Sequence, residues 1–300
     1  MIQNTKSSIR PPVKWHGGKY YLAQRIIKAF PVHNTYVEPF GGAASVLLNK
    51  PTSPVEVYND FDHRITRFFR VLRDHGDDLR QRLSLTPYSE VEFDDAESIH
   101  EDEVEQARRD FVRWRQSIGG RGDNFSYTLH RVRRGMADVV SGYLSAIDSE
   151  LPRIVDRLRT VQILCRPAVE VIRRYDGTGT LFYLDPPYVP TTRAGNGRAA
   201  YKVDMTENDH RELAQTLRQC QGKVMLSGYP STLYGELYKG WRVEQFDIAN
   251  HAASGTTKKR QTECLWFNWT VEEQISTSDT AIELLTRPEN DVSAPYSSIA

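Results

Sequence analysis

The 300-residue sequence lacks the features that mark several large classes of protein. Its three cysteines, Cys165, Cys220 and Cys264, are widely spaced, form no Cys-x-x-Cys pair and have no histidine pattern nearby. This spacing argues against a disulfide framework and predicts no zinc or other metal site. No apolar run approaches the roughly 18 residues of a membrane span, and the polar N-terminus lacks the core of a signal peptide. We therefore expect a protein of the reducing cytoplasm that has no membrane partner.

The sequence also lacks an excess of charge of either sign, because 39 lysines and arginines balance 39 aspartates and glutamates. The overall charge neither favours nor excludes a nucleic-acid partner, and only the local distribution of charge is informative. A hydrophobic fraction of 39% is sufficient for a sizeable buried core in a chain of this length. We expect a globular protein that is a monomer or a weak dimer.

One stretch combines an apolar run with a stiff polar end. Residues 181–184 have the composition of a buried strand, and Asp-Pro-Pro-Tyr follows at 185–188. Each proline fixes its own φ and restricts the residue before it, so Asp185 and the Pro186 carbonyl lie in an extended corner. A carboxylate and a carbonyl there can accept the two hydrogens of an amino group, and Tyr188 can stack on the attached ring. A strand that simply ends at a proline turn is the alternative interpretation.

A second motif lies closer to the N-terminus. Residues 35–48 predict a short strand, a turn of small residues and a helix, and residues 55–59 predict a strand that ends at Asp60. Asp60 follows Gly41 by nineteen positions, which is the spacing of a nucleoside site: the turn lies under the ligand and the acid accepts from ribose hydroxyls. A helix cap is the alternative role for Asp60.

The ligand predicted for this turn carries no phosphate. The dinucleotide pattern Gly-x-Gly-x-x-Gly is absent, and Glu38 and Phe40 stand where a pyrophosphate site would need neutral amides. A nucleoside with a positive or zwitterionic group fits this turn better than a dinucleotide does, and S-adenosylmethionine is such a nucleoside. Upstream, residues 14–19 place two lysines and Trp15 around a glycine pair before a helix predicted over residues 20–30. They can hold an anionic or aromatic ligand, although a glycine turn with solvated lysines is the commoner explanation.

Charge is segregated in residues 89–134. Nine acidic residues and no lysine or arginine lie in 89–107, whereas 108–134 hold eight arginines against two aspartates, with aromatic residues and a glycine-rich turn among them. This mixture is typical of a DNA-binding surface. Pairing of the arginines with the acidic run is the alternative. The candidate DNA contacts are Arg113, Arg115, Arg121, Arg131 and Arg133, together with Arg193 in a glycine-rich loop and Lys258 and Lys259 in a basic loop.

The order of the predicted elements indicates an α/β fold. Strands are predicted at 161–165, 223–227, 242–246 and 263–269, and helices at 169–175, at 206–219 after a capping box, and around 233–237. Strands that alternate with helices on both sides of an insertion at 71–160 predict one mainly parallel sheet with helices on both faces. The insertion is expected to be mainly helical. The polar residues 271–300 predict a disordered tail.

Four motifs, at residues 14–19, 38–42, 59–60 and 185–188, resemble in the same order those of the Dam-type DNA adenine N6-methyltransferases. The resemblance implies a Rossmann-like, S-adenosylmethionine-dependent methyltransferase fold, with the catalytic domain at 11–70 and 161–270 and a DNA target-recognition insertion at 71–160. It implies double-stranded DNA as the partner. The second glycine of the family's turn is Ala44 here. Arg115 and Gly120 are candidate counterparts of positions in the family's recognition hairpin, but the apolar-proline run that usually comes after them is missing, so the target sequence does not carry over.

The same resemblance implies roles for individual residues. Asp185, Pro186 and Tyr188 would hold an adenine flipped out of the duplex, and the methyl group would pass directly to its N6 atom without a metal. A cytosine N4-methyltransferase, whose motif usually begins with serine, and a catalytically silent DNA-binding relative remain alternatives. The setting would be prokaryotic or phage-encoded, in restriction-modification or in an orphan role. The implied donor contacts are Trp15, Lys19, Glu38, Phe40, Gly42, Asp60 and Asp185.

Overall fold

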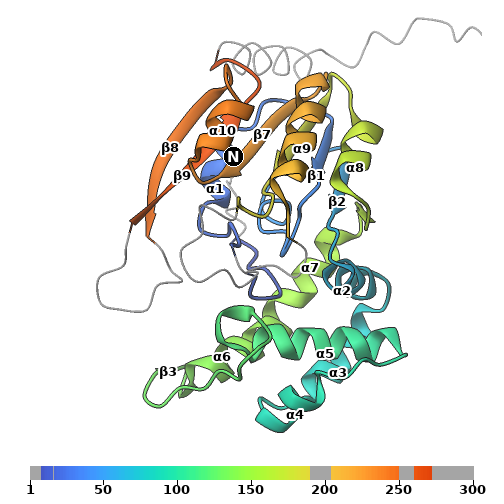
Figure 1. Ribbon diagram of the computed structural model, residues 1–300. Helices are drawn as coiled ribbons and strands as arrows, with labels where there is room; N and C mark the ends of the chain where they lie inside the picture. The colour runs from blue at the N-terminus through green and yellow to red at the C-terminus, as the bar shows by residue number, and fades with distance from the viewer. Residues whose placement is uncertain (1–7, 16, 190–203, 250–259, 272–300) are drawn as a thin grey trace, which may run out of the picture.

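The computed structural model describes residues 8–15, 17–189, 204–249 and 260–271. Its main body is a seven-stranded sheet of order β5-β2-β1-β6-β7-β9-β8 (Figure 1). Strands β5, β2, β1, β6 and β7 are parallel to one another, whereas β9 pairs antiparallel with β7 and with β8. This arrangement confirms the predicted α/β fold with a mainly parallel sheet.

The parallel strands lie where the sequence predicts them, because each is a short segment with apolar, β-branched or aromatic residues that is bounded by turn residues. The final hairpin is longer than predicted, since residues 247–249 pair with residues 260–262. The strands are Thr35–Glu38 (β1), Val55–Asn59 (β2), Val161–Leu164 (β5), Thr180–Leu184 (β6), Lys223–Gly228 (β7), Arg242–Ala249 (β8) and Arg260–Phe267 (β9).

Helices cover both faces of the sheet. Successive strand residues point to opposite faces, so Phe182 and Leu184 of β6 face one side and Leu181 and Tyr183 the other. The first face packs against α8 (Ala168–Tyr175), α9 (Glu207–Gln219) and α10 (Thr232–Leu237), which Figure 1 shows over the sheet. The second face packs against α1 (Ala23–Lys28) and against helices of the insertion. Asp185 belongs to this second face.

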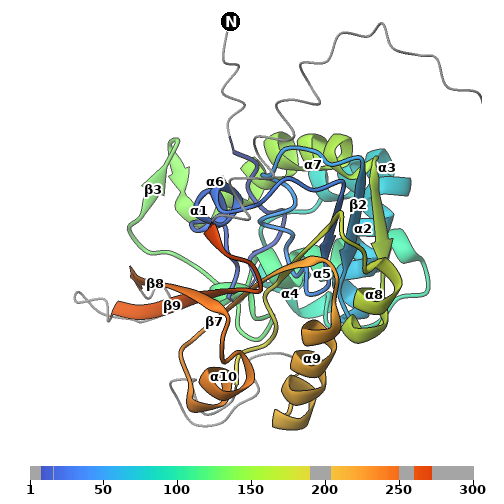
Figure 2. The same ribbon diagram turned by 90° about the horizontal axis from the view of Figure 1, so that it is seen from above.

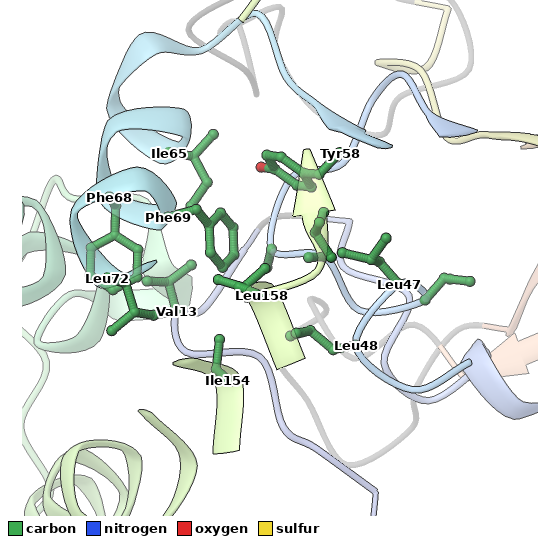
Figure 3. Close-up of a cluster of buried hydrophobic side chains, with 14 of the residues drawn as sticks. Val13, Leu47, Leu48, Tyr58, Ile65, Phe68, Phe69, Leu72, Ile154 and Leu158 are labelled. Carbon is green, nitrogen blue, oxygen red and sulfur yellow. The ribbon is translucent and has the colours of Figure 1, made fainter. Parts of the chain in front are cut away.

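The insertion is mainly helical, as predicted, and gathers at one end of the sheet in Figure 1, whereas Figure 2 views the molecule from the opposite end. In Figure 3, Phe69 of α2 faces Leu158 of α7 and Tyr58 of β2, so one hydrophobic core continues from the insertion to the sheet. The predicted boundary at residue 71 falls inside α2. The helices are α2 (His63–Asp74), α3 (Gly76–Ser84), α4 (Glu90–Asp95), α5 (Glu103–Arg115), α6 (Asp138–Ser145) and α7 (Leu151–Leu158), with short turns η1 (Ile118–Gly120) and η2 (Ala146–Glu150).

Three local predictions differ from the structure. The helix predicted after the small-residue turn is a series of turns, because Ala44 has a φ of 58°, in the left-handed region that interrupts helical hydrogen bonding. The helix predicted over residues 20–30 is limited to α1, since residues 20–22 form turns. The insertion also contains a hairpin that was not predicted, formed by β3 (Val132–Arg133) and β4 (Met136–Ala137).

A buried cluster of charges fastens α7 to the sheet. Glu56 of β2 is 1% exposed, and its two carboxylate oxygens lie 2.6 Å from Arg157 Nη1 and 2.6 Å from Lys50 Nζ. Arg157 also donates to the carbonyl of Leu47 at 2.9 Å, and Lys50 donates to Ser53 Oγ at 2.7 Å. One carboxylate therefore connects the last helix of the insertion with the segment that follows the glycine turn.

Three candidate DNA contacts, Arg193, Lys258 and Lys259, and residues 272–300 of the predicted tail lie outside the described residues. In the part of the chain that is described, no helix has both the length and the apolar character needed to cross a membrane.

Candidate active site

Asp185 lies at the carboxyl end of β6, in the middle of the sheet. The register pairs Leu184 with Leu226, which places Asp185 beside Ser227 of β7. Ser227 donates from Oγ to Asp185 Oδ1 at 2.9 Å, and Lys19 Nζ lies 2.8 Å from the same oxygen. Within the described residues both contacts go to Oδ1, so Oδ2 remains available to accept a hydrogen from a ligand. The side chain is 20% exposed and can be reached from solvent.

Lys19 is a buried cation between two acids. It is 6% exposed, and Nζ contacts Asp185, the hydroxyl of Tyr188 and, at 3.3 Å, the carbonyl of Gly17. Glu263 Oε1 lies 3.6 Å away. Burial alone would lower the pKa of Lys19, but the carboxylates of Asp185 and Glu263 outweigh burial and raise it. Lys19 therefore stays an ammonium group: it can anchor Asp185 but cannot serve as a base.

Tyr188 and Glu263 complete this group. The hydroxyl of Tyr188 donates to Glu263 Oε1 at 3.0 Å, and its ring centroid lies 4.2 Å from that of Tyr229. Glu263 belongs to β9 and is 1% exposed. Burial raises the pKa of Glu263 to about 7, and Asp185 adds to this rise while Lys19 opposes it. The structure thus brings together two residues predicted from the sequence, Lys19 before α1 and Tyr188 after β6, with Glu263 from the last strand.

The glycine turn forms a second group at the ends of β1 and β2. Gly42 has a φ of 47°, and its N–H donates to Asp60 Oδ2 at 2.8 Å. A Cβ atom on Gly42 would lie 2.6 Å from Trp15 Nε1, so the turn requires glycine there both for its φ and for this close approach. The predicted residues Trp15, Gly42 and Asp60 are therefore neighbours in the structure.

Asp60 does not cap the following helix. The N-cap of α2 is Asp62, whose side chain accepts from the N–H of Arg64 at 2.9 Å. Asp60 Oδ1 accepts from the N–H of Asp62 at 2.8 Å, so backbone N–H groups hold both of its oxygens. A carboxylate has about four acceptor sites, and Asp60 can therefore also accept from a ligand hydroxyl. Burial raises the pKa of Asp60 to about 6, although the backbone hydrogen bonds from Asp62 and Gly42 oppose the rise.

Glu38 supports the glycine turn from inside the protein. It is 2% exposed, and its Oε2 accepts from the Tyr36 hydroxyl at 2.8 Å and from the N–H of Leu47 at 3.1 Å. Burial raises the pKa of Glu38 to about 8, so the group is mostly protonated at neutral pH. Phe40 packs against the core cluster that includes α8, α9 and α10. A direct donor contact by Glu38 or Phe40 stays a prediction.

The insertion packs against the loop that supplies Trp15 and Lys19. Trp114 of α5 meets Trp15 edge to face, with ring centroids 6.0 Å apart. Lys14 Nζ donates to the carbonyl of Ser117 at 3.5 Å, and a Cβ atom on Gly120 would lie 2.3 Å from the carbonyl oxygen of Lys14. Gly120, with a φ of 75°, therefore lets the insertion approach the loop closely.

Part of the arginine-rich segment is paired with the acidic run, as the alternative interpretation proposed. Arg108 and Arg109 lie 2.7 and 2.9 Å from Glu105, one helical turn earlier in α5. Arg108 also lies 2.8 Å from Glu92 of α4. These two arginines stabilise the packing of α4 on α5.

The candidate DNA contacts Arg113 and Arg115 have partners inside the insertion. Arg113 donates to the carbonyl of Phe93 at 3.0 Å and lies over the Phe93 ring. Arg115 donates to the carbonyl of Gly142, and burial lowers the pKa of Arg115 to about 10. Both side chains hold the insertion together in this structure, and a contact between either of them and DNA stays a prediction.

Other arginines lie on an exposed hairpin. Arg133 lies in β3 and Arg131 comes directly before it. Figures 1 and 2 show the β3–β4 hairpin projecting from the rest of the insertion. Its turn residues, Arg134 and Gly135, have φ values of 55° and 77°, as a type I′ turn requires. The exposed side chains in and before the hairpin include Arg121, Tyr127, Leu129, Arg131, Val132, Arg133 and Arg134.

Ser227, Tyr229 and Glu263 belong to the site although the sequence motifs do not include them. One signal for Glu263 was present: it alternates with Leu265 and Phe267, and a lone acid on the buried side of an apolar strand is unusual. The partners of Glu263 emerge only when the register of β9 against β7 is known. In the described part of the chain, no group of three or more His, Cys, Asp and Glu side chains is placed to bind a metal ion.

Comparison with known proteins identifies related enzymes over most of the chain. A family model described as D12 class N6 adenine-specific DNA methyltransferase matches residues 15–254. The type II methyltransferase M1.LlaDCHI of Lactococcus lactis subsp. cremoris is 24% identical over 90% of this chain and 99% of its own. The type II methyltransferase M.MjaIII of Methanocaldococcus jannaschii is 25% identical over 79% of this chain and 90% of its own. The DNA adenine methylase of Escherichia coli K12 is 24% identical over 84% of this chain and 93% of its own. The family match ends before Glu263.

Proposed function

The chain belongs to the D12 class of N6 adenine-specific DNA methyltransferases and methylates adenine in DNA, and we propose that it takes the methyl group from S-adenosylmethionine and transfers it to an adenine flipped out of the double helix. Family membership decides for adenine against the cytosine N4 alternative. The placement of Asp185 carries the proposal: Lys19 and Ser227 fix one of its carboxylate oxygens at the carboxyl end of the central strand β6. The neighbouring strand β1 leads into the glycine turn.

The residues near the glycine turn suit this donor. S-adenosylmethionine would supply the methyl group as a positively charged sulfonium. Trp15 offers a half-buried ring for stacking on the nucleoside, and Asp60 keeps lone pairs for ribose hydroxyls. Asp185 and Glu263 supply two carboxyl groups against the single cation of Lys19, which favours a cationic ligand over a phosphate.

Asp185 would act on the target base by orienting it. Its Oδ2 and the carbonyl of Pro186 would accept the two amino hydrogens, while Tyr188 stacks on the ring, so that the N6 lone pair points at the methyl carbon. The bond from N6 to the methyl carbon would form as the carbon–sulfur bond breaks with its electron pair left on sulfur. The proton that N6 loses would pass to solvent by way of Asp185 Oδ2. Positioning and electrostatics supply the rate enhancement, because the step needs no covalent enzyme intermediate.

We assign DNA contact to the exposed basic hairpin and the turn before it. Arg121, Arg131 and Arg133 can reach phosphates, and the exposed Tyr127 and Leu129 can contact base surfaces. Arg113 and Arg115 would support this surface from within, through their hydrogen bonds to the carbonyls of the insertion. As a DNA-modifying enzyme with bacterial and archaeal relatives, the protein would work in the cytoplasm of a prokaryotic cell.

A transfer assay tests the proposed function. The purified protein is incubated with double-stranded DNA and S-adenosylmethionine that carries a tritiated methyl group, and the DNA is then digested to nucleosides. We expect the label in N6-methyladenine. Label in N4-methylcytosine, or no label in DNA, would refute the proposal. Sequencing the product with base modifications resolved would then identify the recognised site.

The salt dependence of DNA binding tests the hairpin. Replacing Arg133 with alanine is expected to reduce the slope of log Kd against log salt concentration by about 0.9, because one phosphate contact releases about one counterion. Arg211→Ala is the matched control, since Arg211 is an exposed arginine on α9 that pairs with Glu207. Anisotropy titrations of a labelled duplex at several salt concentrations measure both slopes. Equal slopes for the two variants would remove the hairpin from the DNA-binding surface.

The pH dependence of donor binding tests Asp60. Its raised pKa of about 6 means that the carboxylate becomes protonated as the pH falls through 6 and then accepts hydrogen bonds less well. We expect the affinity for S-adenosylmethionine to fall by up to about tenfold per pH unit below this value, and to be retained above it. Calorimetric titrations at a series of pH values provide the measurement. Asp60→Asn should flatten this part of the profile, and an unchanged profile would assign the titration to another group.

A further inference from the structure

Glu263 contributes charge to the donor site but has no role in the transfer step, although its buried carboxyl group contacts Tyr188 and Lys19, two residues of that step. A buried carboxylate is costly unless cations and hydrogen bonds compensate it. Both oxygens of Glu263 lie within 3.3 Å of the Tyr188 hydroxyl, and Oε1 lies 3.6 Å from Lys19 Nζ. The position is 1% exposed, so Glu263 lies behind these two side chains and does not face a bound ligand.

The register of the sheet explains how an acid from β9 reaches this site. Ser227 of β7 pairs with Leu265, and Gly228 pairs with Cys264, so Glu263 comes level with Tyr229, just beyond the end of β7. Glu263 shares a face of the sheet with Leu265, because side chains alternate along a strand. Its carboxyl group is thereby directed to the same side as Asp185.

A continuous series of contacts connects Glu263 with Asp185. Glu263 accepts from the Tyr188 hydroxyl, the Tyr188 hydroxyl contacts Lys19, and Lys19 holds Asp185 Oδ1. The ammonium of Lys19 also lies 4.8 Å from the centroid of the Tyr188 ring. The ring that would stack on the target base and the cation that orients the catalytic carboxylate therefore share one anchor.

On the basis of the proposed function, we propose that Glu263 is a positioning residue for methyl transfer. Its carboxyl group fixes the hydroxyl of Tyr188, and through it the ring of Tyr188 and the ammonium of Lys19. Without the carboxylate, Tyr188 keeps its contact with Lys19 and its packing on Tyr229, and Lys19 keeps its contacts with Asp185, Tyr188 and a backbone carbonyl. Both groups are then held less firmly, and the target base and Asp185 spend less time in the reactive arrangement. This role acts on kcat more than on the binding of either substrate.

A double-mutant cycle between Glu263 and Tyr188 tests the proposal. Glu263→Gln keeps the shape of the side chain but leaves the Tyr188 hydroxyl only a neutral amide oxygen, a weaker acceptor than a carboxylate. Tyr188→Phe removes the hydroxyl but keeps the stacking ring. We expect each variant to lower kcat by about 10- to 100-fold with less than about threefold change in KM for the donor. The double variant should be no slower than the slower single variant by more than about threefold, because Glu263→Gln weakens, and Tyr188→Phe removes, the same hydrogen bond.

Controls separate positioning from stability. Glu244→Gln, the same substitution on the neighbouring strand β8, is expected to leave kcat unchanged, since Glu244 pairs with Arg242. Fluorescence of 2-aminopurine at the target position should report altered stacking of the flipped base in Glu263→Gln at saturating protein. If Glu263→Gln does not fold, the kcat of Tyr188→Phe tests the proposal by itself. A wild-type kcat in Tyr188→Phe would overturn the proposal.

The outcomes distinguish this proposal from the function on which it depends. Additive effects in the cycle, with an active wild-type protein, would show that Glu263 acts independently of Tyr188 and would overturn the positioning role alone. A loss of activity that tracks a loss of folded protein, measured by thermal melting, would do the same. A wild-type protein that transfers no methyl group to adenine would overturn the proposed function and this inference with it.

Discussion

Replacing Asp185 with alanine is expected to lower kcat for methyl transfer by at least about a thousandfold while leaving most of the affinity for DNA. The variant loses the only side-chain acceptor that the mechanism places on the amino group. It also releases Lys19, whose Nζ lies 2.8 Å from Asp185 Oδ1 in the native protein. Both losses act on the orientation of N6, whereas the proposed DNA contacts lie on the insertion.

Two measurements on the same protein preparation examine this expectation. Single-turnover transfer of a tritiated methyl group gives the rate of the chemical step, and anisotropy with a labelled duplex gives the DNA affinity. Asp77→Ala is the control, because Asp77 is a fully exposed acid on α3. A rate for Asp185→Ala within about tenfold of the wild type would contradict the role given to this carboxylate. A parallel collapse of DNA affinity would instead indicate that the variant is misfolded.

The sequence predicts the parallel sheet because the signal for its strands is local. Each of the five parallel strands is a short segment with apolar, β-branched or aromatic residues, and turn residues follow it. The predictions failed where one residue changes a local conformation. Ala44 keeps its segment out of a helix by adopting a φ of 58°, at a cost of about 1 kcal/mol or more for a residue with a Cβ atom. The β3 and β4 strands are too short to produce a periodic pattern.

The residues of the candidate site also differ in how far the local sequence predicts them. Lys19, Asp60 and Asp185 stand in short motifs that the sequence displays directly. Glu263 reaches the site only because β9 runs antiparallel to β7 at a particular register, and no local pattern encodes that register. The charge of the insertion is a third case: the spacing of Glu105 and Arg108 permits an ion pair, but whether an arginine is paired or exposed depends on the packing of α4 on α5.

The buried charge cluster around Glu56 is expected to make a large contribution to the stability of the fold. Glu56→Gln is expected to lower the free energy of unfolding by about 3–5 kcal/mol, because it leaves Lys50 and Arg157 buried without their shared carboxylate. Burial alone would raise the pKa of Glu56, but the hydrogen bonds from Arg157 and Lys50 lower it below its ordinary value. The stabilising contribution is therefore present above the ordinary glutamate pKa and is lost as the pH falls through the lowered value in the folded protein. Urea denaturation of both proteins at several pH values measures the difference.

Arg157→Met provides the contrast that identifies the cause. This variant also breaks the cluster, but it leaves Lys50 and Glu56 as a neutral buried pair 2.6 Å apart and replaces the guanidinium with an apolar chain. The loss of stability should be smaller than for Glu56→Gln, since the uncompensated charge and not the number of lost contacts sets the cost. If the two variants lose equal stability, lost contacts determine the cost and the charge argument is wrong. Because Arg157 also holds the carbonyl of Leu47 behind the glycine turn, Arg157→Met should weaken donor binding even under conditions where the protein is fully folded.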